Sequence, residues 1–133
     1  MMIELAVQTE RQVQFKEITA EIERIVRHAD IRSGLVTLFV PHTTAAVTIN
    51  ENADPDVAVD MIHGLDKLAP LRDSAYRHLE GNSAAHIKSS LIGCSEQIII
   101  AEGRLLLGTW QGIYFCEFDG PRSRKLIVKL SAD

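Results

Sequence analysis

Three of the five histidines in this chain lie in two short polar windows, residues 42–56 and 78–88. His42 opens the first window, and His78 and His86 belong to the second. Both windows also hold carboxylate, amide and hydroxyl side chains, which together with imidazole are the ingredients of a metal or anion site. The sequence therefore predicts a functional site where these two windows meet in the fold.

The second window has the pattern of an anion site at the start of a helix. If Asn82 or Ser83 caps the helix, His86 lies in its first turn, beside free backbone N–H groups and the positive end of the helix dipole. Lys88 adds a formal positive charge close by. Such a helix start favours a phosphate or carboxylate group, so we expect Asn82, Ser83 and Lys88 to bind an anion.

A metal site is the second interpretation of the same residues. If His42, His78 and His86 converge, they offer three imidazole ligands and an open fourth position, which zinc accepts in catalytic sites. Glu80 or Asn82 would then orient the rings. Magnesium prefers oxygen ligands, so we expect it only where a diphosphate substrate brings it. The histidine spacing matches no standard structural zinc motif, and direct binding of phosphate by the three rings remains an alternative.

The candidate catalytic residues are His86, Glu80 and His42, as acid or base groups. Four more polar residues are candidates for anion binding, and each also has an ordinary structural interpretation. Thr43 and Thr44 would bind through their hydroxyls, although threonine is common in strands, and Gln111 would otherwise face solvent. Arg122 would hold an anion in a bidentate manner or would instead pair with Asp119 in a turn. These candidates are Thr43, Thr44, Gln111 and Arg122.

Other polar and glycine-rich positions favour structural roles. Asp54 precedes Pro55, and these are a favoured N-cap and a favoured first helical residue. Glu51, Asp54 and Asp56 resemble a hard-cation site, but helix capping explains the aspartates equally well. The glycines on either side of Trp110, in the segment 108–112, indicate a close backbone approach or a strand bend.

Composition excludes several classes of protein. The chain has 133 residues, of which 46% are hydrophobic and 24% charged, and its formal charge is −4, so we expect neither disorder nor a nucleic-acid partner. No apolar run approaches the roughly 18 residues that span a bilayer, so no membrane partner is expected. Cys94 and Cys116 are too few for a disulfide framework, and no secretory signal is visible, so we expect a cytoplasmic protein with reduced thiols.

Hydrophobic periodicity predicts strands at both ends of the chain and helices between them. The run at 35–40 is apolar on both faces, which is typical of a central strand covered on both sides. No repeat or linker interrupts the pattern, so residues 1–133 form a single α+β domain built on antiparallel sheet. The predicted helices are 17–30, 55–69 and 83–92, and the predicted strands are 2–9, 12–15, 35–40, 44–50, 98–100, 105–107, 113–118 and 125–130.

Three separated motifs in this chain closely resemble those of the YjbQ-type family. They are His42-Thr43-Thr44-Ala45 with Asn50-Glu51-Asn52, His78-Leu79-Glu80-Gly81-Asn82-Ser83-Ala84-Ala85-His86, and Leu107-Gly108-Thr109-Trp110-Gln111-Gly112. The resemblance covers essentially the whole chain. It implies a sandwich of antiparallel sheets with about three helices, assembly as a homotrimer, and a pocket near the histidines that sometimes holds a metal or an anion.

The resemblance also implies weak thiamine-phosphate synthase activity, which joins a pyrimidine methyl diphosphate to a thiazole phosphate. The dedicated enzyme resembles a TIM barrel, which needs at least about 200 residues, so any such activity here would be convergent. Two other functions fit the same residues. One is a metal-dependent hydrolase, and the other is a non-catalytic protein that binds a metal or a phosphorylated metabolite.

Overall fold

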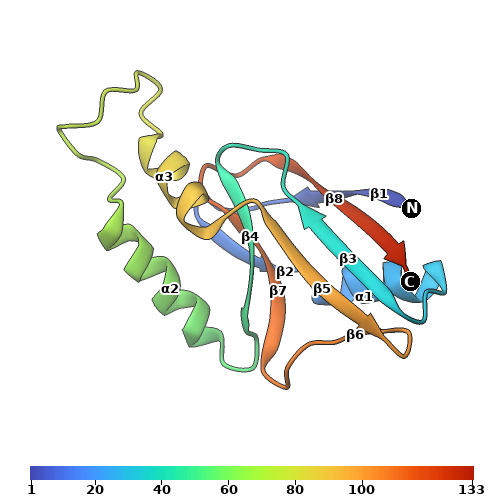
Figure 1. The fold of residues 1–133 in the computed structure, drawn as a ribbon. Coiled ribbons are helices and arrows are strands. Elements are labelled where there is room, and N and C mark those ends of the chain that lie inside the picture. Colours follow the sequence, from blue (N-terminus) through green and yellow to red (C-terminus); the bar gives the residue numbers. More distant parts are fainter.

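Two antiparallel sheets form the body of the protein in the computed structural model, which describes residues 1–133 (Figure 1). One sheet has five strands in the order β1-β8-β3-β5-β6, and the other has three in the order β2-β7-β4. The strands are β1 (Met2–Gln8), β2 (Gln14–Glu17), β3 (Gly34–Phe39), β4 (Ala45–Glu51), β5 (Ser95–Ala101), β6 (Arg104–Leu105), β7 (Gln111–Glu117) and β8 (Ser123–Ala132).

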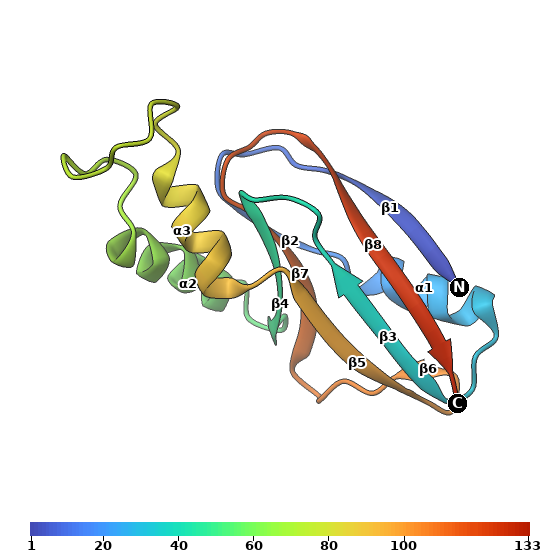
Figure 2. The ribbon, with the colours of Figure 1, turned by 45° about the horizontal axis from the view of Figure 1, so that its top comes forward.

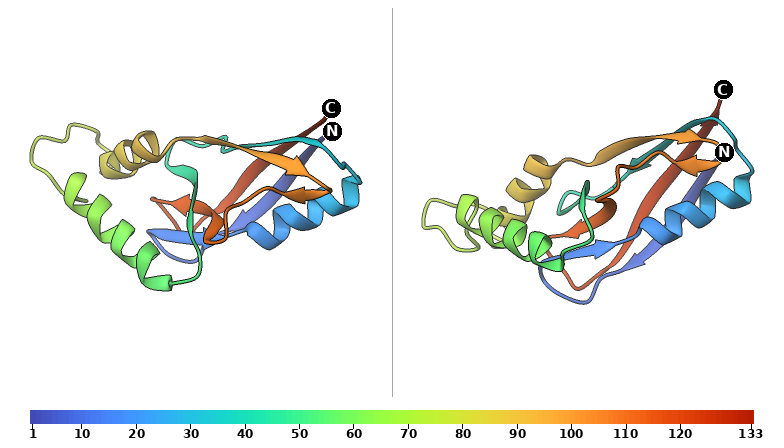
Figure 3. Two further views of the ribbon diagram at one scale, coloured as in Figure 1. Left: turned by 60° about the horizontal axis from the view of Figure 1, so that its bottom comes forward. Right: turned by 90° about the horizontal axis from the view of Figure 1, so that it is seen from below.

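Three helices flank the sheets, α1 (Thr19–Ala29), α2 (Pro55–Leu68) and α3 (Ser83–Ile92). Figures 2 and 3 show α2 and α3 together at one end of the sheets, with α1 near the opposite end. No helix is long and apolar enough to cross a membrane. The architecture confirms the predicted α+β class, with two packed antiparallel sheets and three helices.

The main core lies between the facing sides of the two sheets and α1. Alternate residues of β3, β5 and β8 point inward, as the period of a strand requires, and Phe115 of β7 meets them fully buried. A smaller cluster packs α2 and α3 against the other face of the three-stranded sheet through Leu65, Ala85 and Tyr114. Since β7 is covered on both faces, every residue of it after Gln111 is buried.

Local sequence signals explain most element boundaries. Asp54 caps α2, and its side chain accepts a hydrogen bond from the Asp56 amide at 2.9 Å, with Pro55 as the first helical residue. This confirms the capping interpretation of that aspartate. His28 hydrogen-bonds through Nδ1 to the Arg24 carbonyl at 2.8 Å in the last turn of α1.

Three predicted details need correction. The strand expected at 12–15 lies at Gln14–Glu17, and the strand expected at 105–107 shortens to Arg104–Leu105. The strand at 35–40 is central in its sheet but is not covered on both sides. Its outward residues Leu35, Thr37 and Phe39 are partly or largely exposed, with Phe39 at 45%, because only the opposite face meets the core.

Candidate functional site

A polar cleft of about 550 Å³ opens where the segment before β4, the start of α3 and the turn between β7 and β8 meet. The cleft contains all three histidines of the two polar windows. The two windows therefore meet in the fold, as the sequence predicts. Its lining residues are Pro41, His42, Thr43, Thr44, His78, Glu80, Asn82, His86, Asp119, Arg122 and Arg124.

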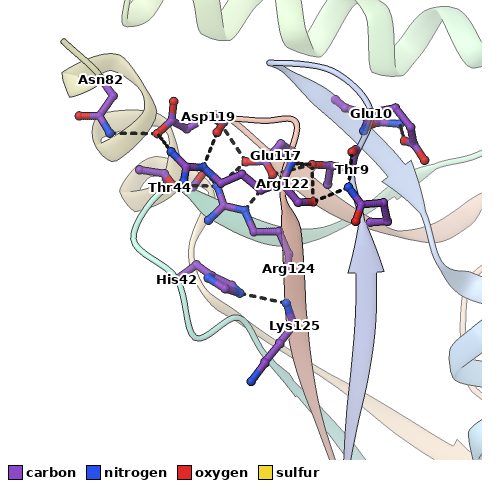
Figure 4. Close-up of polar contacts among 12 residues, drawn as sticks. Thr9, Glu10, His42, Thr44, Asn82, Glu117, Asp119, Arg122, Arg124 and Lys125 are labelled. Atoms are coloured by element: carbon purple, nitrogen blue, oxygen red, sulfur yellow. Dashed lines mark hydrogen bonds and ion pairs between the residues drawn. The ribbon is translucent and has the colours of Figure 1, made fainter. Parts of the chain in front are cut away.

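Arg124, which lines the cleft, forms a buried ion pair with Glu117 (Figure 4). Arg124 donates from Nε to Glu117 Oε1 at 2.8 Å and from Nη2 to Glu117 Oε2, and Nη2 also reaches Thr44 Oγ1 at 2.8 Å. The Glu117 carboxylate further accepts from Thr9 Oγ1 at 2.8 Å and from the Asp119 amide at 3.0 Å. Burial alone would raise the pKa of Glu117, but these donors outweigh it and lower the pKa.

One end of the Arg124 guanidinium stays available to a ligand. Its Nε and Nη2 are used within the chain, whereas Nη1 makes no hydrogen bond and is not among the fully buried unpaired atoms. Arg124 lines the cleft, and Nη1 is the nitrogen of its guanidinium without a partner in the chain. Because Glu117 already takes the bidentate edge, Nη1 can donate only to a single oxygen of a carboxylate or phosphate group.

A second guanidinium is held at the rim of the cleft. Arg122 donates from Nε to the Asp119 carbonyl at 2.7 Å and from Nη2 to Asp119 Oδ2 at 3.0 Å. Asn82 Nδ2 donates to the same Oδ2 at 3.0 Å, which ties the start of α3 to the β7–β8 turn. Asn82 Oδ1 is buried without a partner. Arg122 therefore pairs with Asp119, which is one of the two interpretations of the sequence; it also lines the cleft, and anion binding by Arg122 stays a prediction.

His42 is held in its neutral form with a defined tautomer. Burial lowers its pKa, and the positive charge of Arg124 lowers it further. His42 Nε2 accepts a hydrogen bond from the Lys125 amide at 3.0 Å. A neutral ring that accepts at Nε2 carries its proton at Nδ1, so His42 acts as a hydrogen-bond donor at that atom.

His78 and His86 lie together on the side of the cleft nearest α3. Their rings meet edge to face with centroids 5.6 Å apart, and His78 Nε2 lies 3.9 Å from Glu80 Oε1. That last distance is too long for a hydrogen bond. The two rings and Glu80 therefore remain free to contact a bound molecule.

The residues of this chain do not by themselves fit a zinc ion. No group of three or more histidine, cysteine, aspartate or glutamate side chains is placed to hold a metal. His42 Nε2 is occupied by the Lys125 amide, which leaves His78 and His86, whereas catalytic zinc usually has three protein ligands. Zinc binding and magnesium binding stay predictions, and no step below depends on them.

Three predicted anion-binding residues lie outside the cleft. Lys88 is buried and pairs with Asp66 of α2. Ser83 faces a neighbouring hollow beside His86. Gln111 lies at the opposite end of β7 from Glu117, about 20 Å away at the rise of a strand, and its Oε1 accepts from the Gly108 amide at 2.7 Å.

The glycine-rich segment around Trp110 has the close backbone approach expected from its sequence. A Cβ at Gly112 would lie 2.5 Å from Asn52 Nδ2, so the side chain of Asn52 occupies the space that glycine leaves. The backbone N–H of Asn52 donates to the Trp110 carbonyl at 3.0 Å, which fixes the segment against the end of β4.

Arg124 and Glu117 are the functional residues that sequence reasoning missed. Arg124 shares the inward parity of Leu126, Val128 and Leu130 along β8, and Glu117 ends the buried run of β7. A charged residue at a core position requires a partner of opposite charge. That signal would have suggested a buried pair, although the sequence alone does not say which acid meets which base.

Comparison with known proteins, by sequence and by structure, finds proteins of one family. The family described as UPF0047 protein YjbQ-like matches residues 3–133. The chain is 49% identical to the UPF0047 protein YugU of Bacillus subtilis (strain 168), over 98% of both chains. The chain belongs to the YjbQ-like UPF0047 family. It is also 49% identical to the UPF0047 protein MJ1081 of Methanocaldococcus jannaschii, over 100% of this chain and 96% of the relative.

Solved structures of YjbQ-like proteins share the fold. A protein of Clostridium acetobutylicum, described as an uncharacterized conserved protein of the yjbq/upf0047 family, superposes with a TM-score of 0.94 at 53% identity, covering 97% of this chain and 99% of that one. A YbjQ-like protein of unknown function from Sulfolobus solfataricus P2 has a TM-score of 0.95 at 31% identity, covering 100% of this chain and 97% of that one.

These comparisons correct the functional expectation drawn from the family resemblance. The matched YjbQ-like relatives carry only the UPF0047 designation, and the solved members are described as uncharacterized or of unknown function. Thiamine-phosphate synthase activity was therefore a wrong inference from the family, because membership of the YjbQ-like family implies no such transferase. Function has to be argued from the cleft.

Proposed function

We propose that the polar cleft binds a small molecule that carries a phosphate or carboxylate group. The observation that supports this most directly is the pair of guanidiniums, Arg122 and Arg124, fixed at one site with donors left unused. Each is immobilised before a ligand arrives, so less side-chain freedom is lost on binding. Guanidinium N–H groups suit carboxylate and phosphate oxygens, and each of these two arginines keeps Nη1 without a partner in the chain.

The remaining lining residues extend the same recognition. Thr43 and Thr44 line the cleft together with the two arginines. His42 can donate from Nδ1, because its Nε2 accepts from the Lys125 amide. The cleft volume of about 550 Å³ suits a small metabolite, and the polar lining disfavours a hydrophobic one. We therefore infer a compact, highly polar ligand.

The charge balance limits how much anion the guanidiniums alone can hold. Glu117 neutralises Arg124, and Asp119 neutralises Arg122. Glu80 also lines the cleft, so the two arginines leave no net positive charge there, and a charged ligand requires further positive charge from elsewhere. This balance distinguishes the site from an uncompensated basic patch, which would bind polyanions without selectivity.

Calorimetry of the purified chain with inorganic phosphate and with a small phosphate monoester tests the proposal. Arg122→Gln should weaken binding by roughly ten- to a hundredfold, since a hydrogen bond to a charged group contributes roughly 1.5–3 kcal/mol. Arg104→Gln is the matched control, because Arg104 is exposed, carries the same charge and lies on β6 outside the cleft. The proposal would be contradicted if neither probe bound, or if Arg122→Gln and Arg104→Gln lost the same amount of affinity.

A further inference from the structure

The connection between α2 and α3 contains a segment, residues 70–81, that is hydrogen-bonded only to itself. The Tyr76 amide donates to the Asp73 carbonyl, the Ala75 amide to Asp73 Oδ1, and Tyr76 Oη to the Pro70 carbonyl. The Gly81 amide donates to the His78 carbonyl. No hydrogen bond or ion pair joins residues 70–81 to the rest of the chain, so the segment can move without breaking one.

This segment, called the 70–81 segment below, projects from the body of the protein. Figures 1 and 2 show it as the long loop beyond the ends of α2 and α3. Every residue in it is exposed except Tyr76, which is half-buried, and Leu79 is fully exposed. An exposed segment with few contacts belongs to the least stable part of a fold.

Both ends of the 70–81 segment are anchored. Ala69 is buried, and its amide donates to the Leu65 carbonyl at 2.9 Å. Asn82 is tied to Asp119. Gly81, next to Asn82, has a φ of +76° and no neighbour within 4 Å of a would-be Cβ, so it has the freedom to act as a hinge.

The segment carries arginines with no acidic partner, next to residues of the cleft. Neither Arg72 nor Arg77 forms an ion pair within the chain. Arg77 shares a hollow of about 490 Å³ with His78 and His86, both of which also line the cleft. Arg72 faces another hollow, of about 680 Å³, which reaches Gln12 and includes His78 and Glu80 of the cleft but not His86. Unfilled space therefore lies beside the segment where it passes the cleft.

We propose that the 70–81 segment is a lid, that an anion bound in the cleft closes it, and that Arg77 is the cation which the closed lid adds to the site. This inference rests on the proposed anion binding and extends it to a binding residue and a conformational change. Glu117 and Asp119 neutralise the two fixed arginines, and Glu80 of the segment adds a further carboxylate to the cleft, so a bound anion needs a further cation. Arg77 is the unpaired arginine that shares a hollow with two histidines of the cleft.

The contact with Arg77 explains how a bound anion would favour the closed conformation of the segment. A ligand shifts an equilibrium only by its differential affinity for the two states, and a contact with Arg77 that exists only in the closed state provides that difference. Inorganic phosphate carries more than one negative charge near neutral pH, so its charge exceeds what the fixed guanidiniums can balance. It is therefore a suitable probe.

Hydrogen exchange of the full chain, followed by mass spectrometry with and without inorganic phosphate, tests the lid. Amides of residues 71–80 should exchange rapidly in free protein and at least about tenfold more slowly with saturating phosphate. Arg77→Gln should remove this protection and weaken phosphate binding by about tenfold. Arg72→Gln is the matched control, with the same charge change in the same segment, and should keep most of both effects.

The outcomes separate the lid from the proposed function. No phosphate binding by calorimetry contradicts anion binding itself. Phosphate binding with unchanged exchange at 71–80 overturns the lid alone, as does strong protection of these amides in the free protein. Equal losses in Arg72→Gln and Arg77→Gln overturn the assignment of Arg77, because general charge rather than position would then decide.

Discussion

Arg124 and Glu117 form a doubly hydrogen-bonded ion pair that is almost completely buried, yet Arg124 also lines an open polar cleft. The pair joins β7 to β8 at the point where both strands reach the cleft. Thr9, which follows β1, donates a hydrogen bond to the Glu117 carboxylate, and Thr44 accepts one from Arg124. Residues from three separate parts of the sequence therefore hold the Arg124 guanidinium in place. A buried ion pair often adds little stability over an apolar pair, and we propose that this fixed charge serves recognition.

Removal of the carboxylate should show the cost of leaving Arg124 unpaired. We expect Glu117→Gln to lower the free energy of unfolding at neutral pH by about 3 kcal/mol, because breaking a buried pair leaves an uncompensated charge. The pKa of Glu117 is lowered from its ordinary value of 4.5 in the folded chain. Its stabilising contribution is therefore complete above that value and is lost as the pH falls through the lowered pKa. Urea denaturation across pH measures this, with exposed Glu80→Gln as control.

His42 should make stability depend on pH in a different range. Burial and the charge of Arg124 lower its pKa below the ordinary histidine value of 6.5, so the unfolded chain binds this proton more readily than the folded one. Stability therefore rises with pH between the lowered pKa and 6.5, and falls on acidification through that window. His42→Gln should flatten this dependence between about pH 7 and pH 5. The exposed His63→Gln variant should keep the wild-type slope, and an unchanged slope in His42→Gln would refute the assignment.

The close approach of Asn52 to Gly112 gives a test at the opposite end of β4. Gly112→Ala places a Cβ 2.5 Å from Asn52 Nδ2 and should destabilise the fold by about 1–3 kcal/mol, the usual effect of overpacking. Gly64→Ala is the matched control, because Gly64 lies within α2 with nothing within 4 Å of its would-be Cβ. Alanine is the better helix former, so thermal unfolding should show Gly64→Ala unchanged or slightly stabilised.

The parts of the structure that local chemistry determines were predictable from the sequence. Asp54 and Pro55 mark the start of α2, and the alternation of Leu126, Val128 and Leu130 marks β8. The convergence of His42 with His86 was predictable too, because both lie at element ends in polar windows. The Arg124–Glu117 pair was not, since partner choice depends on which strands meet. The position of Lys88 was mispredicted because its nearest acid, Asp66, lies on another helix.

Self-association is a further expectation from the family resemblance, and exposed apolar residues of α2 and α3 support it. We propose that the chain forms a homotrimer. Leu65 is the only buried residue of α2, and apolar side chains are exposed on more than one side of this end of the protein: Val59 at 60%, Leu68 at 73%, and Leu91 of α3 at 58%. A helix of this length is only marginally stable on its own, so further burial of its apolar side chains would stabilise it. Closed ring assembly is a common way for a small domain to cover such a surface.

Light scattering of the purified chain at micromolar concentration should therefore give the mass of a trimer. Val59→Lys should shift the mass toward the monomer, because it places a charge on the exposed face of α2. Met2→Lys is the control, since Met2 is similarly exposed, at 65%, but lies on β1, away from α2. A monomeric mass for the unmodified chain would refute the trimer. A trimer that survives Val59→Lys but dissociates in Met2→Lys would instead place the contact on the five-stranded sheet, whose outward residue Phe39 is also exposed.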